Sequence, residues 1–288
     1  MSLYATERGI LLRAAELAGR SLMRDFARLS SLPISEKGPS DFVSSADLDA
    51  QALLWAELSA AFPTYGFLLE EEAGPGEPRA GAGQANARTT ADARFIVDPL
   101  DGTTNFLHGI PHFAVSIALE VKGEVVVGVV LNPANSELFW AAKGAGAWLG
   151  ERRLTVAPPK KTAHCIVGTG IPHIGRPARD PFLSALAKIM PEVAGIRRLG
   201  CAALDLAYVA AGRFDMFWEV GLSAWDIAAG QLLVKEAAGL VTSCNGEPLR
   251  LDGADILATN GEALHRTAMR WLETDLSTPG GHPTDASR

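Results

Sequence analysis

The pattern of hydrophobic runs changes at Pro158-Pro159, and this change constrains the fold more than any other feature of the sequence. Before it, apolar residues recur at near-helical spacing from Ile10 to Phe26, which predicts a long amphipathic helix. A second helix is expected over 47–61. The β-rich runs within 114–131, joined through Lys122-Gly123, predict an antiparallel hairpin.

After Pro158-Pro159, short strand-like runs alternate with helical patterns. Strands are expected over 165–168, 214–220 and 256–259, and helices over 181–190, 202–211, 225–238 and from 261 onward. Gly212 and Gly239 follow two of these helices, at the position where glycine commonly ends a helix. The expected fold class is therefore α/β, with a β-rich first half and an alternating second half.

The chain is long enough to bury a large core, since it has 288 residues of which 48% are hydrophobic. We expect a single domain over 1–273, made of two packed lobes at about 1–157 and 158–273. Residues 74–92, rich in Gly, Pro and Ala, predict a mobile surface loop. The Ser-, Thr-, Pro- and Gly-rich tail over 274–288 predicts disorder.

The charge and the cysteines indicate the class of protein. A formal net charge of -7 disfavours a mainly electrostatic nucleic-acid binder. The three cysteines are widely spaced and form no CxxC pair, which is typical of reduced thiols in the cytoplasm. No uncharged segment is long enough to span a bilayer, so we expect a soluble, unprocessed cytoplasmic protein.

The stretch Asp98-Pro99-Leu100-Asp101-Gly102-Thr103-Thr104-Asn105-Phe106 carries the strongest chemical signal. Pro99 predicts that the strand over 94–97 ends here. Two carboxylates three positions apart would repel one another unless a hard cation lay between them, and oxygen ligands of this kind suit Mg²⁺. Gly102 would let a ligand approach the backbone, beside the hydroxyl and amide groups of Thr103. An ordinary Asx-type turn is the competing interpretation.

Two further acidic clusters strengthen the metal interpretation when all three are considered together. Glu70-Glu71-Glu72 follow a short predicted strand, and Asp226 lies at the start of a predicted helix. Taken alone, the glutamates could be a solvated loop and Asp226 a favourable charge at a helix N-terminus. Asp47, in the first turn of the second helix, has the same simple explanation.

The sequence resembles the inositol monophosphatase family of Mg²⁺-dependent, lithium-sensitive phosphatases, and is most similar to its bacterial inositol-1-monophosphatase branch. The resemblance rests on three motifs in order, and covers nearly the whole chain short of the tail. The motifs are Leu68-Leu69-Glu70-Glu71-Glu72-Ala73-Gly74, the string from Asp98 to Phe106, and Trp225-Asp226-Ile227-Ala228-Ala229-Gly230. The resemblance implies a layered sandwich of alternating helices and sheets, and a homodimer.

By position, the resemblance implies a metal site for two to three Mg²⁺ ions. Glu71, Asp98 and the carbonyl of Leu100 would hold one ion, and Asp98, Asp101 and Asp226 would hold a second. A third ion would contact Glu71 and be otherwise hydrated. Glu70 departs from the family pattern, in which this position is usually Gly.

The same resemblance implies the roles of the residues around the metals. Water would attack phosphorus directly, without a phosphoenzyme, and would be oriented by Thr103 and Glu71, with Asp47 supporting Thr103. The substrate-binding positions would be Asp101, Gly102, Thr103, Gly200, Ala202, Glu219 and Asp226. Among them, Glu219 would contact the alcohol and so select it, although an exposed acid at a strand end is an alternative reading.

The expected activity is hydrolysis of inositol 1-phosphate or a similar small polyol phosphate. Histidinol phosphate, fructose 1,6-bisphosphate and 3′-phosphoadenosine 5′-phosphate remain alternative substrates, because related enzymes share the metal motifs. A different class of function is a partner of RNA or of the transcription machinery, since some bacterial relatives of the family have RNA-linked roles. The complete set of carboxylates disfavours the loss of catalysis but leaves room for such a second role.

Overall fold

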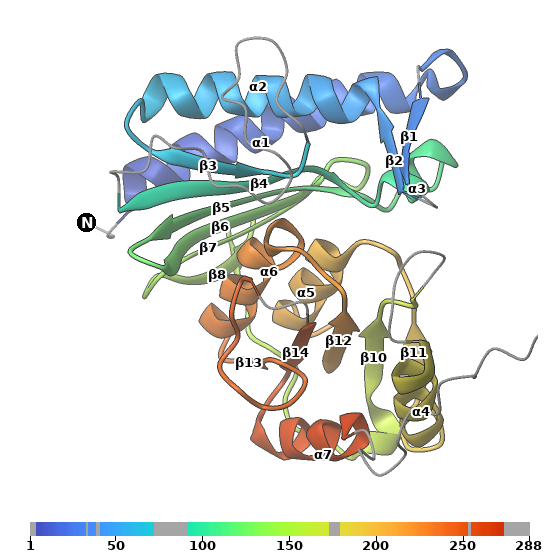
Figure 1. The fold of residues 1–288 in the computed structure, drawn as a ribbon. Helices are drawn as coiled ribbons and strands as arrows, with labels where there is room; N and C mark the ends of the chain where they lie inside the picture. The colour runs from blue at the N-terminus through green and yellow to red at the C-terminus, as the bar shows by residue number, and fades with distance from the viewer. Residues whose placement is uncertain are drawn as a thin grey trace, which may run out of the picture.

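Two β-sheets alternate with three layers of helices in the computed structural model, which describes residues 4–32, 34–38, 41–71, 92–172, 179–252 and 255–273. Figure 1 shows the order of the layers: α1 and α2, the larger sheet, α5 and α6, the smaller sheet, and finally α4 and α7. The expected α/β fold with alternating helix and sheet layers is thus confirmed. The expected loop over 74–91 and the tail over 274–288 lie outside the described residues.

Helices α1 (Ala5–Phe26) and α2 (Ser45–Ala61) cover the outer face of the larger sheet. Leu11, Ala15 and Leu22 recur on one face of α1 and are fully buried, as the helical spacing predicted. Between the two helices lie the short 3₁₀ helix Leu29–Ser31 and the hairpin of β1 (Ile34–Gly38) and β2 (Asp41–Ser44). The strand β2 leads directly into the N-cap of α2.

The larger sheet has seven strands in the order β3 to β9. They are β3 (Gly66–Leu69), β4 (Ala93–Asp101), β5 (Ala114–Val121), β6 (Glu124–Asn132), β7 (Glu137–Ala142), β8 (Gly146–Leu149) and β9 (Arg152–Arg153). Only the β3–β4 pair is parallel. At the tip of the expected β5–β6 hairpin, Lys122 and Gly123 both have positive φ, as a tight hairpin turn requires.

The prediction that the fourth strand ends at Asp98 is wrong. Asp98 pairs with Ser116, and Asp101 then pairs with Ala114, so β4 carries one extra residue relative to β5. A bulge of this kind tolerates Pro99, because residues in a bulge need not donate to the ladder. The strand therefore continues through the acidic string, and the five-residue helix α3 (Thr103–Leu107) follows it.

The smaller sheet has five strands in the order β11-β10-β12-β14-β13. They are β10 (Ile166–Thr169), β11 (Gly195–Arg197), β12 (Met216–Val220), β13 (Leu240–Thr242) and β14 (Asp255–Thr259). The accompanying helices are α4 (Arg179–Ile189), α5 (Ala202–Ala210), α6 (Ala224–Glu236) and α7 (Glu262–Leu272), with a 3₁₀ turn at Thr162–His164. The chain passes from one sheet to the other between β9 and β10, in the segment that contains the expected lobe boundary.

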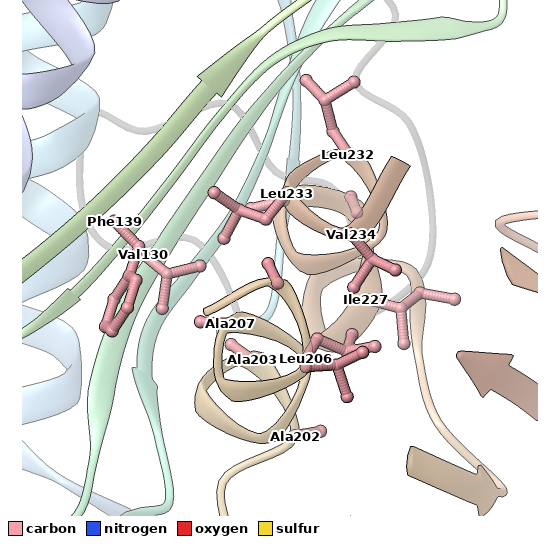
Figure 2. Packing of buried hydrophobic residues seen from close by; sticks show 14 of the residues in the cluster. Val130, Phe139, Ala202, Ala203, Leu206, Ala207, Ile227, Leu232, Leu233 and Val234 are labelled. Carbon is pink, nitrogen blue, oxygen red and sulfur yellow. The ribbon is translucent and has the colours of Figure 1, made fainter. Parts of the chain in front are cut away.

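Helices α5 and α6 fill the space between the two sheets. Figure 2 shows Val130 and Phe139 of the larger sheet facing Ala203 and Ala207 of α5 and Leu233 of α6. A Cβ atom on Gly128 of β6 would lie 2.8 Å from the carbonyl oxygen of Ala229, and one on Gly230 would lie 2.6 Å from Leu206. These close approaches leave no room for side chains, so α6 packs directly against β6 and α5.

The far end of α6 is attached to the edge of the larger sheet. The carboxylate of Glu236 accepts hydrogen bonds from the backbone N–H of Gly144 at 2.9 Å and of Gly146 at 2.8 Å. Gly144 lies in the β7–β8 turn, and Gly146 begins β8. In the described part of the chain, no helix is both long and apolar enough to cross a membrane.

Candidate functional site

A buried carboxyl group at the bulge of β4 forms the centre of an acidic site. Asp98 is 1% exposed and interacts with Glu70, Asp101 and Asp226, which belong to three different parts of the chain. Burial raises the pKa of Asp98 well above its usual range, and the nearby Glu70, Asp101 and Asp226 raise it further. Residues from all three acidic clusters of the sequence therefore lie within electrostatic range of one another.

The backbone of the bulge is organised around this carboxyl group. The Leu100 N–H donates to Asp98 Oδ1 at 3.0 Å, and the Leu100 carbonyl lies 3.0 Å from the Thr103 hydroxyl. Gly102 has φ +93°, and a Cβ atom there would lie 3.2 Å from the carbonyl oxygens of Gly200 and His112. Glycine at this position thus meets both a conformational and a steric requirement.

Asp47 connects the start of α2 to Thr103. Its Oδ2 atom accepts from the backbone N–H of Ser44 at 2.9 Å and from the Ser44 hydroxyl at 2.6 Å, completing a capping box. Its Oδ1 atom lies 3.2 Å from the Thr103 hydroxyl. The expected contact between Asp47 and Thr103 is present, and Asp47 is fully buried.

The glutamate segment is positioned by both backbone and side-chain contacts. The Glu70 N–H donates to the Val97 carbonyl at 3.2 Å, which continues the β3–β4 pairing by one residue. The side-chain amide of Gln51 in α2 accepts from the Glu71 N–H at 3.0 Å and donates to the Glu71 carbonyl at 3.3 Å. Glu71 is 3% exposed.

Glu70 is the glutamate whose carboxyl group hydrogen-bonds to that of Asp98. The family resemblance gave the ligand position to Glu71 and treated Glu70 as an additional charge. The contact with Asp98 places Glu70 in the acidic site. The position of Glu70 in the motif did not predict this contact.

Asp101 receives its hydrogen bonds from the start of α5. Its Oδ2 atom accepts from the Ala203 N–H at 2.7 Å and from the Cys201 thiol at 3.2 Å. Close by, the Asn105 amide donates to the carbonyls of Leu199 and His112, both at 2.8 Å. The acidic string therefore lies at the junction of β4 with the segment that leads into α5.

Asp226 occupies the first turn of α6. Its Oδ2 atom accepts from the Ser223 N–H at 2.7 Å, and the two residues form a capping box. The carbonyl of the preceding Trp225 accepts from the Ser116 hydroxyl at 3.3 Å, which attaches this turn to β5. Asp226 is thus both a helix-capping residue and a member of the acidic group, so the two interpretations of the sequence are compatible.

The positions expected to contact the alcohol lie near the same junction. Glu219 is on β12, and a Cβ atom on Gly170 would lie 1.9 to 2.3 Å from its carboxyl atoms, so the carboxyl group rests on the Gly170 backbone. Gly200 precedes α5 and has φ +82°. Ala202 is the first residue of α5 and is nearly buried.

Sequence reasoning overlooked Asp205. It is 1% exposed, and its Oδ1 atom has no hydrogen-bond partner. Burial raises the pKa of Asp205 well above its usual range; Glu219 and Asp101 raise it further, and Arg198 lowers it. An aspartate within the otherwise apolar run of α5 was the signal that could have identified it.

The donor set fits a hard divalent cation. Within the described segments, no three Asp, Glu, His or Cys side chains form a ready-made coordination shell. The carboxylates instead take hydrogen bonds from the protein and from one another. All the carboxylates offer oxygen atoms, however, which are the ligands that hard cations prefer. A bound cation would also offset the repulsion between Asp98 and its acidic neighbours.

Comparison with known proteins identifies similar chains. The model of the inositol monophosphatase family matches residues 6–275. A protein from Mesorhizobium japonicum named inositol-1-monophosphatase is 51% identical over 268 residues, which cover 93% of this chain and 96% of the relative. A protein from Pseudomonas aeruginosa named Nus factor SuhB is 45% identical over 253 residues, covering 87% and 90% of the two chains.

Solved structures with the same fold include relatives of both names. The extragenic suppressor protein suhB from Bartonella henselae has a TM-score of 0.87 and 46% identity, and covers 94% of this chain and 100% of its own. An inositol monophosphatase from Anabaena has a TM-score of 0.78 and 33% identity, with 93% and 95% coverage.

The raised pKa of Asp98 predicts how stability depends on pH. An aspartate in an unfolded chain loses its proton near pH 3.9, whereas folded, cation-free Asp98 keeps it to higher pH, so the free energy of unfolding falls as pH rises between the two pKa values. The Asp98→Asn substitution removes this fall in the free energy of unfolding. In EDTA, the variant should exceed the wild type in melting temperature by a margin that widens as the pH rises above about 4.

The matched control is Asp92→Asn, because the Asp92 side chain is 73% exposed. Its melting temperature should follow the wild type at every pH. An Asp98→Asn curve parallel to that of the wild type would show that burial among acids does not destabilise the cation-free site.

Proposed function

The chain belongs to the inositol monophosphatase family and is a phosphoric monoester hydrolase, and from this premise we propose that it hydrolyses inositol 1-phosphate or a similar small polyol phosphate with Mg²⁺ as cofactor. The observation that carries the proposal is the burial of Asp98 beside Glu70, Asp101 and Asp226. A buried cluster of carboxylates is unfavourable on its own, and it becomes favourable when divalent cations bind.

The proposed ligands for two to three Mg²⁺ ions are the carboxylates of Asp98, Asp101 and Asp226, the carbonyl of Leu100 and one glutamate. When bound, Mg²⁺ would lower the pKa of a coordinated water and neutralise the charge that develops on the ester oxygens. Because the site is acidic without cations, the anionic ester should bind well only to the Mg²⁺-loaded protein.

The glutamate ligand is Glu70 or Glu71. The motif resemblance favours Glu71, whereas the hydrogen bond to Asp98 supports Glu70. We propose Glu70 as the principal ligand, since a cation shared with Asp98 must lie within reach of both carboxyl groups. Glu71, which Gln51 holds through its backbone, then remains the candidate for orienting water.

Thr103 has the geometry to orient the attacking water. Its hydroxyl proton can be donated to Asp47 Oδ1 at 3.2 Å or to the Leu100 carbonyl at 3.0 Å. In both cases the lone pairs of the hydroxyl oxygen stay available to accept a hydrogen bond from water. Asp47 therefore fixes the direction of the Thr103 hydroxyl, and the backbone amides of Gly102 and Thr103 are proposed to hold phosphate oxygens.

The alcohol is proposed to bind beside Glu219, between Gly200 and Ala202. The support is the position of the Glu219 carboxyl group on the Gly170 backbone, with the buried Asp205 in electrostatic range. Carboxylates accept hydrogen bonds from hydroxyl groups, which suits a polyol better than a second phosphate. Histidinol phosphate, fructose 1,6-bisphosphate and 3′-phosphoadenosine 5′-phosphate remain the alternative substrates. A cytoplasmic location and a homodimer also remain predictions.

The name of the relative from Pseudomonas aeruginosa supports a second candidate function. This relative is named Nus factor SuhB and is 45% identical to the chain. Association with RNA or the transcription machinery is therefore a second candidate function of the chain. The net charge of -7 means that such binding would depend on a local surface.

Phosphate release from a panel of esters tests the main proposal. Wild-type protein should release phosphate from inositol 1-phosphate faster than from the three alternative substrates, and EDTA or Li⁺ should suppress the release. Asp98→Asn should lower kcat at saturating Mg²⁺ by about 1,000-fold or more. Asp92→Asn should behave as wild type. Activity that persists in EDTA would refute the role of Mg²⁺.

Separate substitutions of the two glutamates test the ligand assignment. Glu70→Gln should raise the Mg²⁺ concentration for half-maximal activity by about 10–100-fold, a range that even outer-shell substitutions reach. Glu71→Gln should lower kcat with a smaller change in Mg²⁺ dependence. The reverse order would return the ligand position to Glu71.

RNA binding by the inactive Asp98→Asn variant tests the second candidate function. Binding that weakens as salt rises, in a protein without phosphatase activity, would show that the two functions are separate. If no complex forms with RNA even at low salt, direct RNA binding is ruled out as the basis of this role.

A further inference from the structure

A cavity of about 540 Å³ lies at the C-terminal end of α6, at the opposite end of this helix from Asp226. Its walls come from the larger sheet, the last two turns of α6 and residues 249–252 of the loop between β13 and β14. None of the residues assigned above to metal or substrate lines it. Cavities of about 300–1,000 Å³ accommodate small organic ligands, so this cavity can serve a separate function.

The charged groups of this cavity are neutralised with one exception. Three ion pairs join cations and carboxylates that line it: Arg94 with Glu120, Lys143 with Glu124, and Arg250 with Asp252. The carboxylate of Glu236 accepts the two glycine N–H groups described above. Lys235 has no carboxylate partner among the described residues, and its hydrogen bond runs from Nζ to the side-chain oxygen of Gln231 at 2.6 Å. Lys235 is therefore the cation of the cavity that only a neutral group holds.

The two lysines of the cavity differ in how readily they lose a proton. The hydrogen bond to Glu124 raises the pKa of Lys143. Burial lowers the pKa of Lys235, and the more distant Glu124 opposes this shift. At neutral pH a larger share of Lys235 is therefore the neutral amine, which is the nucleophilic form. Lys235 is also exposed, so a reagent in the cavity can reach it.

We propose that this cavity is an acylation site, in which Lys235 accepts an acyl group from a small acyl phosphate. The lone pair of Nζ attacks the acyl carbon and forms an amide bond. The bond between that carbon and the bridging phosphate oxygen breaks, inorganic phosphate leaves with the electron pair, and Nζ gives up a proton to water. The acyl phosphate is the one co-reactant, and no oxidant or reductant is needed.

The arginines of the cavity supply hydrogen-bond donors for the phosphate of the reagent. Arg94 uses Nε for its contact with Glu120, and Arg250 uses Nε and one terminal nitrogen for Asp252. Each guanidinium group has further N–H groups beyond these contacts, and arginine binds phosphate through such groups. The cavity has as many carboxylates as cations, so these local hydrogen bonds hold the phosphate rather than a net positive charge.

Acetyl phosphate is the probe for the first test, with peptide mass spectrometry measuring the acetylation rate of each lysine. The reaction is run in EDTA, so that the proposed Mg²⁺-dependent activity does not consume the reagent. Lys143 is the matched internal control, because it lines the same cavity but is ion-paired. Near pH 7, Lys235 should react at least about threefold faster than Lys143, and this ratio should fall as rising pH deprotonates both amines.

A phosphate-free reagent, N-acetylimidazole, tests the role of the arginines. Arg250→Gln should slow the acetylation of Lys235 by acetyl phosphate about threefold, and should leave its acetylation by N-acetylimidazole within about twofold of wild type. Inorganic phosphate should protect Lys235 from acetyl phosphate alone. The control is Arg152→Gln, because Arg152 is an exposed arginine of β9 that does not line the cavity.

Two outcomes would overturn the proposal. If Lys235 reacts with acetyl phosphate no faster than Lys143 does, Lys235 is not an acylation site. If Arg250→Gln affects both reagents alike or neither of them, the cavity does not select the phosphate. Circular dichroism of each variant identifies a general loss of folding. Because no arm of the test requires Mg²⁺ or ester hydrolysis, its result is independent of the proposed phosphatase function.

Discussion

The cost of burying Asp98 among other carboxylates is the constraint on which the site depends. Glu70, Asp101 and Asp226 all raise the pKa of this nearly inaccessible group. A protein that only needed stability would place an apolar residue there, since an uncompensated buried charge is expensive. The surrounding structure must therefore supply enough stability to hold four acids together until a cation relieves their repulsion.

Three of the acidic residues, Asp47, Asp101 and Asp226, accept hydrogen bonds at the N-terminal ends of helices. Asp47 and Asp226 are capping-box residues at the starts of α2 and α6, and Asp101 accepts from the first turn of α5. Helix N-termini carry free N–H groups and a favourable potential for anions. The layered fold brings these three helix starts to the end of β4, which explains why residues remote in sequence meet at one place.

Regular periodicity made the long elements predictable from sequence, and local contacts decided the rest. The helix α1 was visible because apolar residues recur along it at helical spacing, and the β5–β6 hairpin because two β-rich runs flank Lys122-Gly123. The short strands β9, β11 and β13 have two or three residues each, too few for a period to appear. The bulge at Pro99 and the contact of Glu70 with Asp98 depend on the register between strands, which a single strand's sequence does not encode. The three acidic motifs nevertheless contain Glu70, Asp98, Asp101 and Asp226, which the structure brings within electrostatic range of one another.

Helix α6 spans from the edge of the larger sheet to the acidic site, and its length sets the distance between them. Glu236 binds the backbone of Gly144 and Gly146 at one end of the helix. Asp226 lies in the first turn at the other end, ten positions earlier, which corresponds to about 15 Å along the helix axis. Each residue added to or removed from the helix between Asp226 and Glu236 would rotate Asp226 by about 100° around the helix axis relative to Glu236. The length of this helix therefore sets the position of Asp226 relative to the edge of the larger sheet.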